Sequence, residues 1–320
     1  MDNPNSPDNE PGWERKAIEK LAFAALEEQR KRRYWGIFFK SVGFVYLFAV
    51  LVALVDWDAT AEHQERHSAL VDLRGVIEAK GEANAENLVA ALVAAFEEKH
   101  AAGIILRINS PGGSPVQAGI INDEIRRLRA KYPDKPLYAV VEDMCASGGY
   151  YVAVAADKIF VDKASIVGSI GVLMDGFGFT GAMDKLGVER RLLTAGENKG
   201  FLDPFSPQRS EHKVHAQQLL DSIHRQFIEV VRAGRGSRLK ETPEMFSGFM
   251  WTGEQSIELG LADELGSVDS VAREVIKTEK IVDYSVKENI AERFAKRFGA
   301  STAALFWKSL VQGAGDVSLR

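Results

Sequence analysis

The amino-acid sequence predicts an α/β fold, in which helices pack over a mostly parallel sheet, preceded by one apolar helix. Short apolar runs alternate with amphipathic runs from residue 69 onward, which is the order expected of a parallel sheet. Two of these apolar runs end in a glycine pair, and a helical pattern follows each pair. Residues 37–55 form an apolar stretch long enough to cross a bilayer as a helix.

The composition is that of a globular protein and excludes some classes of function. Of the 320 residues, 46% are hydrophobic and 27% are charged. A net charge of −5 gives no reason to expect nucleic-acid binding. The single cysteine excludes an internal disulfide framework.

The first part of the chain is predicted to be a membrane anchor. Residues 1–33 are polar and end in a basic cluster, which places them in the cytoplasm by the positive-inside rule. Residues 34–57 form the predicted single-pass transmembrane anchor, with Trp35 and Trp57 near its two ends. A buried core helix is the alternative interpretation of this stretch. Residues 58–68 are a predicted juxtamembrane linker, and everything after the anchor is predicted to lie across the membrane.

The rest of the chain divides into a folded domain, 69–286, and an amphipathic C-terminal segment, 287–320. Apolar β-type runs predict strands at 69–77, 103–108, 137–142, 158–161, 187–193 and 281–285. Amphipathic or tightly packed runs predict helices at 84–99, 116–131, 148–156, 206–234 and 268–278. The segment 287–320 mixes aromatic and basic residues, which suits a helix that docks on a neighbouring subunit or lies on a membrane surface. The 206–234 helix carries three histidines that lack an obvious nucleophile or carboxylate partner and are interpreted as surface or packing residues: His212, His215 and His224.

The main candidate for chemistry is Ser147, in the stretch Met144-Cys145-Ala146-Ser147-Gly148-Gly149-Tyr150-Tyr151. It stands where a predicted strand gives way to a helix N-terminus, where unpaired N–H groups and the helix dipole favour an oxyanion. Gly148 and Gly149 leave room around the hydroxyl. Taken alone, the pattern fits a helix N-cap as well as a nucleophile.

A second candidate is the stretch Asn109-Ser110-Pro111-Gly112-Gly113-Ser114, which follows the strand at 103–108. A glycine pair at such a turn exposes backbone N–H groups, which predicts a second oxyanion donor or a peptide-binding edge. It is not a Walker phosphate loop, because the Lys-Ser/Thr ending is missing.

These two stretches resemble those of the signal peptide peptidase A (SppA) family of membrane-anchored serine proteases. Val167-Gly168-Ser169-Ile170-Gly171-Val172 and Gly196-Glu197-Asn198-Lys199 also match, so the resemblance covers roughly residues 69–285. It implies a ClpP/crotonase-like fold of repeated strand-strand-helix units. It also implies that Ser147 is the nucleophile, Lys199 the general base and Ser169 the residue that orients the lysine. Gly113 and Gly148 would then supply the oxyanion hole.

In this mechanism the Ser147 hydroxyl attacks a peptide carbonyl after a neutral lysine takes its proton. An ordinary lysine has a pKa of about 10.4, so a lysine base near pH 8 needs a lowering of about 2 units by desolvation or like charge. The mechanism requires no metal and no cofactor.

The chain resembles half of the longer family members, which implies a ring-shaped homo-oligomer whose Ser147 and Lys199 meet across subunits. The implied substrates are signal peptides and other unfolded apolar peptides, cut on the extracytoplasmic side of a bacterial inner membrane. Two other classes of function stay open. One is a crotonase-like acyl-CoA enzyme, which also uses backbone oxyanion holes, and the other is a catalytically inactive membrane scaffold built on a protease fold.

Overall fold

A computed structural model describes residues 13–53 and 65–286 of the chain. These residues belong to two compact units that divide at residues 62 and 63, and each unit is described by itself. The predictions made for residues 1–12, for 54–64, which include the end of the anchor and most of the linker, and for the amphipathic segment 287–320 lie outside the described residues.

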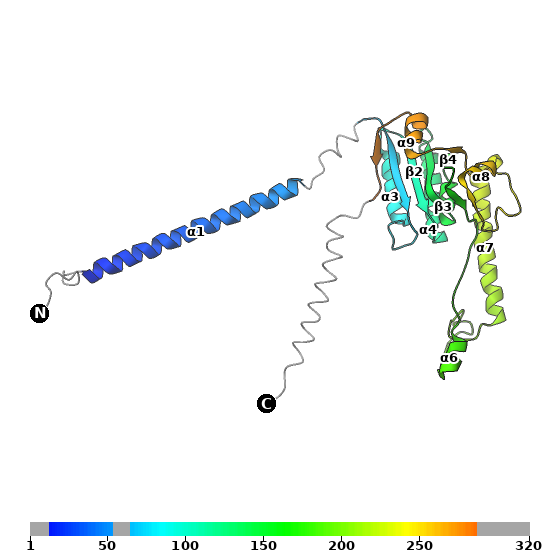
Figure 1. The fold of residues 1–320 in the computed structure, drawn as a ribbon, viewed down its shortest axis with the longest axis horizontal. Helices are drawn as coiled ribbons and strands as arrows, with labels where there is room; N and C mark the ends of the chain where they lie inside the picture. Colours follow the sequence, from blue (N-terminus) through cyan, green and yellow to red (C-terminus); the bar gives the residue numbers. More distant parts are fainter. Residues whose placement is uncertain (1–12, 54–64, 287–320) are drawn as a thin grey trace. The chain divides into compact units, whose positions relative to one another are not determined.

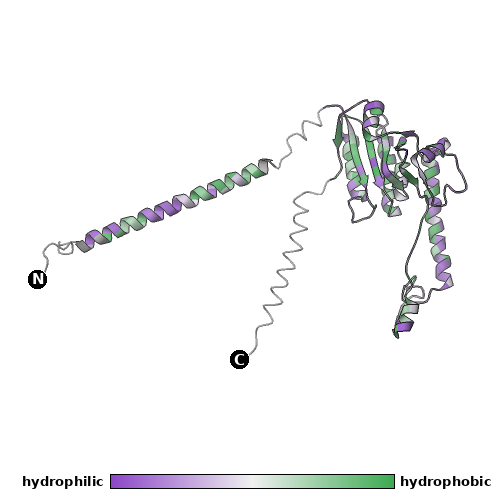
Figure 2. Cartoon of the chain, in the orientation of Figure 1, coloured by the Kyte–Doolittle hydropathy of each residue, from purple (hydrophilic) through white to green (hydrophobic). Residues whose placement is uncertain are grey.

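The described part of the first unit is one continuous helix, α1 (Trp13–Ala53), of 41 residues. Figure 2 shows that its first half is mostly hydrophilic and its second half mostly hydrophobic. Its ring contacts are local, for example Trp35 stacked on Phe39 with centroids 5.6 Å apart. Of the helices in the described residues, none is both long and apolar enough to cross a membrane. The stretch 37–55 that predicts the anchor ends two residues beyond the described part of α1.

The second unit is built on one mixed sheet whose strands are mostly parallel, as the alternating pattern predicts (Figure 1). The main path of hydrogen-bonded neighbours runs β6-β5-β3-β2-β1-β8, and β4 and β7 continue from β3 beside it. Only the β5–β6 pair is antiparallel among the described pairings. The strands are β1 (His67–Arg74), β2 (Ala101–Ser110), β3 (Leu137–Ala146), β4 (Lys158–Val161), β5 (Ile166–Gly168), β6 (Met250–Thr252), β7 (Glu264–Leu265) and β8 (Ile281–Asp283).

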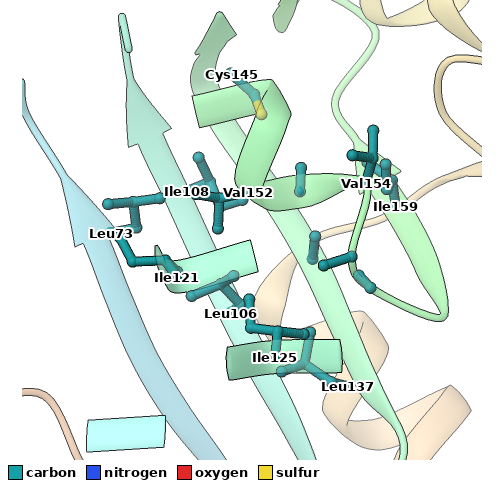
Figure 3. Close-up of a cluster of buried hydrophobic side chains, with 14 of the residues drawn as sticks. Leu73, Leu106, Ile108, Ile121, Ile125, Leu137, Cys145, Val152, Val154 and Ile159 are labelled. Atoms are coloured by element: carbon teal, nitrogen blue, oxygen red, sulfur yellow. The ribbon is translucent and has the colours of Figure 1, made fainter. Parts of the chain in front are cut away.

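Helices cover the sheet and create its core. On one face, α3 (Ala85–Glu97), α4 (Pro115–Lys131) and α5 (Gly148–Ala153) bury a large apolar cluster, part of which Figure 3 shows around Ile108 and Ile121. Two of these helices begin with a side-chain N-cap. The Asn84 side chain accepts a hydrogen bond from the Asn87 N–H at the start of α3, and the Ser114 side chain accepts one from the Gln117 N–H at the start of α4. On the other face, the short α9 (Val268–Ser270) and the π-helical turn η3 (Val271–Ile276) cover a smaller cluster.

A long helix, α7 (Ser210–Arg235), ties the C-terminal part of the chain to the sheet through a buried ion pair. The Arg235 side chain is 1% exposed and forms two hydrogen bonds of 2.9 Å with the Asp263 carboxylate. The Arg235 Nε also donates to the Gly260 carbonyl at 2.8 Å, and Asp263 accepts from the Ile159 N–H at 2.7 Å. Both charges are therefore hydrogen-bonded, which burial requires. After α7 the chain continues through the short turn η2 (Gly236–Arg238) to β6 and then to the short helix α8 (Gly253–Glu258).

Residues 171–209, which we call the arm, leave the sheet after β5 and return at the start of α7. Figure 1 shows the arm, with its short helix α6 (Thr180–Leu186), beside the end of α7 that is farther from the sheet. Large apolar side chains on the arm are exposed: Leu173, Met174, Phe177, Phe179, Leu186, Val188, Leu192, Leu193 and Phe205. Leu193 is 96% exposed. An exposed apolar surface of this kind indicates an interaction site.

The structure corrects several boundaries predicted from the sequence. The strand predicted at 187–193 is wrong, because this stretch lies on the arm, where no neighbouring strand offers backbone partners in the described part of the chain. The sheet begins at His67, inside the predicted linker. The helix predicted at 268–278 is split into α9 and η3 and ends at Ile276, before Lys277, which has a left-handed φ of 66°.

Candidate active site

Ser147 occupies a sharp turn between β3, which ends at Ala146, and α5, which begins at Gly148. Its backbone has φ 51° and ψ −120°, an unusual conformation for a residue with a side chain. Its N–H donates to the Gly168 carbonyl at 2.9 Å, which fixes the turn against β5. Ser147 occupies the N-cap position of α5, as its place in the sequence also suggested, but its hydroxyl makes no capping hydrogen bond. Backbone strain at a partly exposed serine indicates a functional role.

Two backbone N–H groups, those of Gly113 and Gly148, lie beside this serine. Gly148 is the first residue of α5, so its N–H has no acceptor within the helix. Gly113 pairs with Ile77 in a parallel bridge. The Ile77 N–H donates to the Gly112 carbonyl and the Ser114 N–H donates to the Ile77 carbonyl, so the Gly113 N–H faces away from Ile77. A Cβ added to Gly148 would lie 3.2 Å from the Gly113 nitrogen, so the two groups are close neighbours. Their arrangement suits an oxyanion.

Substituting Gly112 by Ala should disrupt this turn. Gly112 has φ 98°, and a Cβ there would lie 2.6 Å from the Gly148 nitrogen and 2.7 Å from the Ser147 Cβ. The displaced N–H should lower kcat by about 100-fold or more, the usual cost of losing one oxyanion donor. Turnover of a fluorogenic peptide, the substrate class that the family resemblance implies, measures the effect.

The matched control is Gly119→Ala in α4. A Cβ at Gly119 meets nothing within 4 Å, and the backbone there is helical. This variant should keep full turnover and gain up to about 1 kcal/mol of stability, because alanine favours a helix interior over glycine. Equal kcat for the two variants would contradict the role given to the glycine turn.

Ser169 lies next to Ser147 in space. The last paired residues of β3 and β5 are Ala146 and Gly168, so the serines that follow them are adjacent across two parallel strands. Ser169 also has a left-handed φ of 51°, and its N–H donates to the Phe249 carbonyl at 2.8 Å. Both serines line the same cavity.

This cavity has a volume of about 570 Å³ and is lined by apolar as well as polar side chains. Its lining includes the site residues Gly113, Ser147, Gly148 and Ser169. The walls are formed mainly by residues for which no functional role was predicted: Pro115, Ala118, Tyr151, Val172, Leu173, Ile223, Gln226 and Phe227. Phe227 and its neighbours lie on α7, and the amphipathic pattern of that helix was the one sequence signal for them. Such a cavity accommodates an apolar side chain of a ligand.

Lys199 does not line this cavity. It lies on the arm, in a tight turn where its N–H donates to the Gly196 carbonyl at 3.1 Å, and its side chain is exposed. The structure thus brings Ser147, Ser169, Gly113 and Gly148 together within one chain and leaves Lys199 apart from them.

The residues around Lys199 are bound to the start of α7. The His212 Nε2 and the Asn198 Oδ1 are 3.2 Å apart. If α7 rises by about 1.5 Å per residue, its cavity-lining residues 223–227 lie about 20 Å along the axis from His212. The same helix therefore carries the lysine turn at one end and a wall of the cavity at the other.

Comparisons with known proteins identify the family of the chain. The model of peptidase family S49 matches residues 129–282, which include Ser147, Ser169 and Lys199. A putative signal peptide peptidase SppA of Enterococcus faecium is 31% identical over 242 residues, which cover 72% of this chain and 70% of that protein. The chain belongs to peptidase family S49. The resemblance to SppA seen in the sequence is thereby confirmed, and the mixed, mostly parallel sheet is consistent with the S49 fold.

Other relatives match shorter parts. A probable protease SohB of Haemophilus influenzae is 30% identical over 196 residues, which cover 61% of this chain and 54% of that protein. A Na(+)/H(+) antiporter NhaA of Brucella melitensis is 47% identical over 179 residues. This chain spans only 24% of that antiporter, and the same share of the antiporter of Brucella abortus. Membership of S49 places the chain in a family of serine peptidases.

Proposed function

We propose that this S49 member is a serine endopeptidase in which Ser147 is the nucleophile and Lys199 the general base. The observation that carries the proposal is the strained turn at Ser147, whose hydroxyl is not used in a helix cap and which borders a partly apolar cavity. The two neighbouring N–H groups of Gly113 and Gly148 supply what an acyl-transfer reaction needs for its oxyanion.

In the proposed reaction the neutral amine of Lys199 takes the proton of the Ser147 hydroxyl while its oxygen bonds to the substrate carbonyl carbon. The N–H groups of Gly113 and Gly148 stabilise the negative charge on the carbonyl oxygen. The lysine then returns the proton to the leaving amine, and a water molecule hydrolyses the acyl-enzyme by the reverse sequence. Ser169, adjacent to Ser147, accepts a hydrogen bond from the lysine ammonium and orients it.

The lysine is proposed to come from a neighbouring subunit of a ring-shaped homo-oligomer. Within one chain, α7 separates the lysine turn from the cavity by a distance that a lysine side chain does not bridge. The exposed apolar side chains of the arm provide the surface that a second copy would cover.

The proposed substrates are unfolded apolar peptides, signal peptides among them. The apolar walls of the cavity, with Val172, Leu173 and Phe227, support this preference. The hydropathy of residues 37–55 and the basic cluster before them support a single-pass anchor in a bacterial inner membrane, with the peptidase domain on the extracytoplasmic side. Protease accessibility of a tag after residue 286, in intact and permeabilised cells, tests this topology.

Covalent labelling tests the proposed nucleophile. A serine-directed fluorophosphonate should attach to the wild-type protein, and mass spectrometry of the modified peptide should locate it on Ser147. Ser169→Ala, which keeps the nucleophile, should still be labelled, whereas Ser147→Ala should not. Labelling elsewhere, or full peptide cleavage by Ser147→Ala, would refute the assignment.

The same experiment separates the two alternatives. A crotonase-like acyl-CoA enzyme would use the N–H groups of Gly113 and Gly148 without a covalent serine step, and an inactive scaffold would show neither labelling nor turnover. The strained serine favours the peptidase, because an N–H oxyanion hole alone does not require it.

A further inference from the structure

The turn that carries Lys199 is attached to α7 on both sides of the lysine. We call residues 196–201 the lysine loop. Before the lysine, the Asn198 Oδ1 accepts a hydrogen bond from the His212 Nε2 at 3.2 Å. After the lysine, the Phe201 ring packs edge-on against the rings of His212 and His215, with centroids 5.3 and 5.6 Å apart. These contacts hold the backbone on either side and leave the lysine side chain exposed.

A third contact comes from the residue that precedes α7. The Arg209 Nη1 donates to the Glu197 carbonyl at 3.4 Å, and its guanidinium also pairs with the Glu197 carboxylate at 3.7 Å. Arg209 is itself paired with Glu211 on the first turn of α7. This contact lies at the surface, so it contributes little by itself.

His212 is the buried member of this set. Only 7% of it is exposed, whereas Lys199 and His215 are exposed. It is also the one side chain of the set that touches the loop on both sides of the lysine, through Asn198 and through Phe201. Within the loop, the Phe201 N–H donates to the Asn198 carbonyl at 3.0 Å, so the two anchored residues belong to one tight turn.

We propose that His212 is a positioning residue, which holds the lysine loop so that Lys199 meets Ser147 of the neighbouring subunit in a reactive geometry. The inference rests on the proposed function. A general base works only within hydrogen-bond reach of its proton, and a misplacement of 1 Å can cost about 100-fold in rate. The position of an exposed lysine on an arm is precise only if its backbone is held in place. His212 holds that backbone through its contacts with Asn198 and Phe201.

Steady-state kinetics of His212 variants test the inference. His212→Ala should lower kcat by about 10- to 100-fold and leave KM within about twofold, because the substrate cavity is lined by other residues. His212→Gln keeps an N–H donor near the position of Nε2 and should restore much of kcat. Lys213→Ala changes an exposed residue on the same turn of α7 and should stay within about twofold of wild type in both parameters.

Mixing experiments show whether the defect belongs to the lysine or to the serine. Ser147→Ala subunits carry an intact lysine loop, so mixing them with His212→Ala subunits should raise activity above that of either alone. Mixing His212→Ala with Lys199→Ala subunits should give no such gain, because both lack a competent loop. The mixture of Ser147→Ala with Lys199→Ala serves as the reference.

Three results would overturn the inference. The first is a rise in KM of His212→Ala without a fall in kcat, and the second is no rescue of kcat by His212→Gln. The third is a gain in activity when His212→Ala subunits are mixed with Lys199→Ala subunits but not when they are mixed with Ser147→Ala subunits. Failure of the proposed function looks different, since Ser147→Ala would then keep its activity. If only the arrangement across subunits were wrong, the reference mixture would stay inactive, and the kcat fall and the glutamine rescue would still decide the role of His212.

Discussion

Ser147→Ala and Lys199→Ala proteins, each inactive alone, should recover peptide cleavage when their subunits are mixed. Each single substitution should lower kcat by about 10⁴-fold or more, because it removes either the proposed nucleophile or the proposed base, and the two are proposed to act as a unit. In a ring with random equal mixing, about a quarter of the contacts join an intact serine to an intact lysine, as expected for a heterologous interface. About a quarter of the wild-type activity should therefore return.

The measurement needs proof that the subunits exchange. The two variants should be mixed after dissociation, reassembled, and analysed by native mass spectrometry with one variant isotopically labelled. The double variant Ser147→Ala/Lys199→Ala, mixed with wild-type subunits, controls for dilution. Confirmed exchange without any recovery would mean that Ser147 and Lys199 react within one chain, which would require the arm to move relative to α7.

The second large effect concerns stability. Arg235→Met should lower the free energy of unfolding by about 3–5 kcal/mol, because it leaves the carboxylate of Asp263 without its main partner in a site where that side chain is only 11% exposed. The control is Arg232→Met on the same helix, since the Arg232 side chain is 53% exposed and pairs with Glu241 at the surface. That variant should lose less than about 1 kcal/mol. Urea unfolding followed by circular dichroism measures both, and equal losses would refute the special role of the buried pair.

The same pair predicts a dependence on pH. Burial tends to raise the pKa of Asp263, but the hydrogen bonds and charge of Arg235 outweigh it and hold that pKa below its usual range. A carboxyl group with a depressed folded-state pKa contributes stability that is present above its unfolded pKa of about 3.9 and is lost as pH falls through the folded value. Wild-type stability should therefore fall in this acid range, and the fall should be smaller in Asp263→Asn. An unchanged acid profile in that variant would contradict the assignment.

The sequence predicted the parts of this fold that depend on local pattern. The strands and helices from β1 to β4 follow from alternating apolar and amphipathic runs, and the turn at Ser147 follows from a strand that runs into two glycines. The adjacency of Ser147 and Ser169 was not visible in the sequence itself, because it comes from the parallel register of β3 and β5. Only the family resemblance connected the two serines before the structure did.

Other features depended on partners far away in the chain. Residues 187–193 have the composition of a strand, but strand formation needs a neighbouring strand, and the arm offers none among the described residues. The buried position of His212 could not be predicted either, because a histidine on an amphipathic helix is most often at the surface. Its burial depends on the return of the arm against the first turns of α7.

The surroundings of Cys145 make the native protein a convenient background for site-selective chemistry. It is the sole cysteine of the chain, it is buried near the end of β3 in the apolar cluster (Figure 3), and burial raises the pKa of its thiol. Alkylating reagents act on exposed thiolates, so they should leave the wild-type chain unmodified. A thiol introduced in place of Lys199 would then be the single reactive one, and aminoethylation would rebuild there a lysine-like amine of altered basicity.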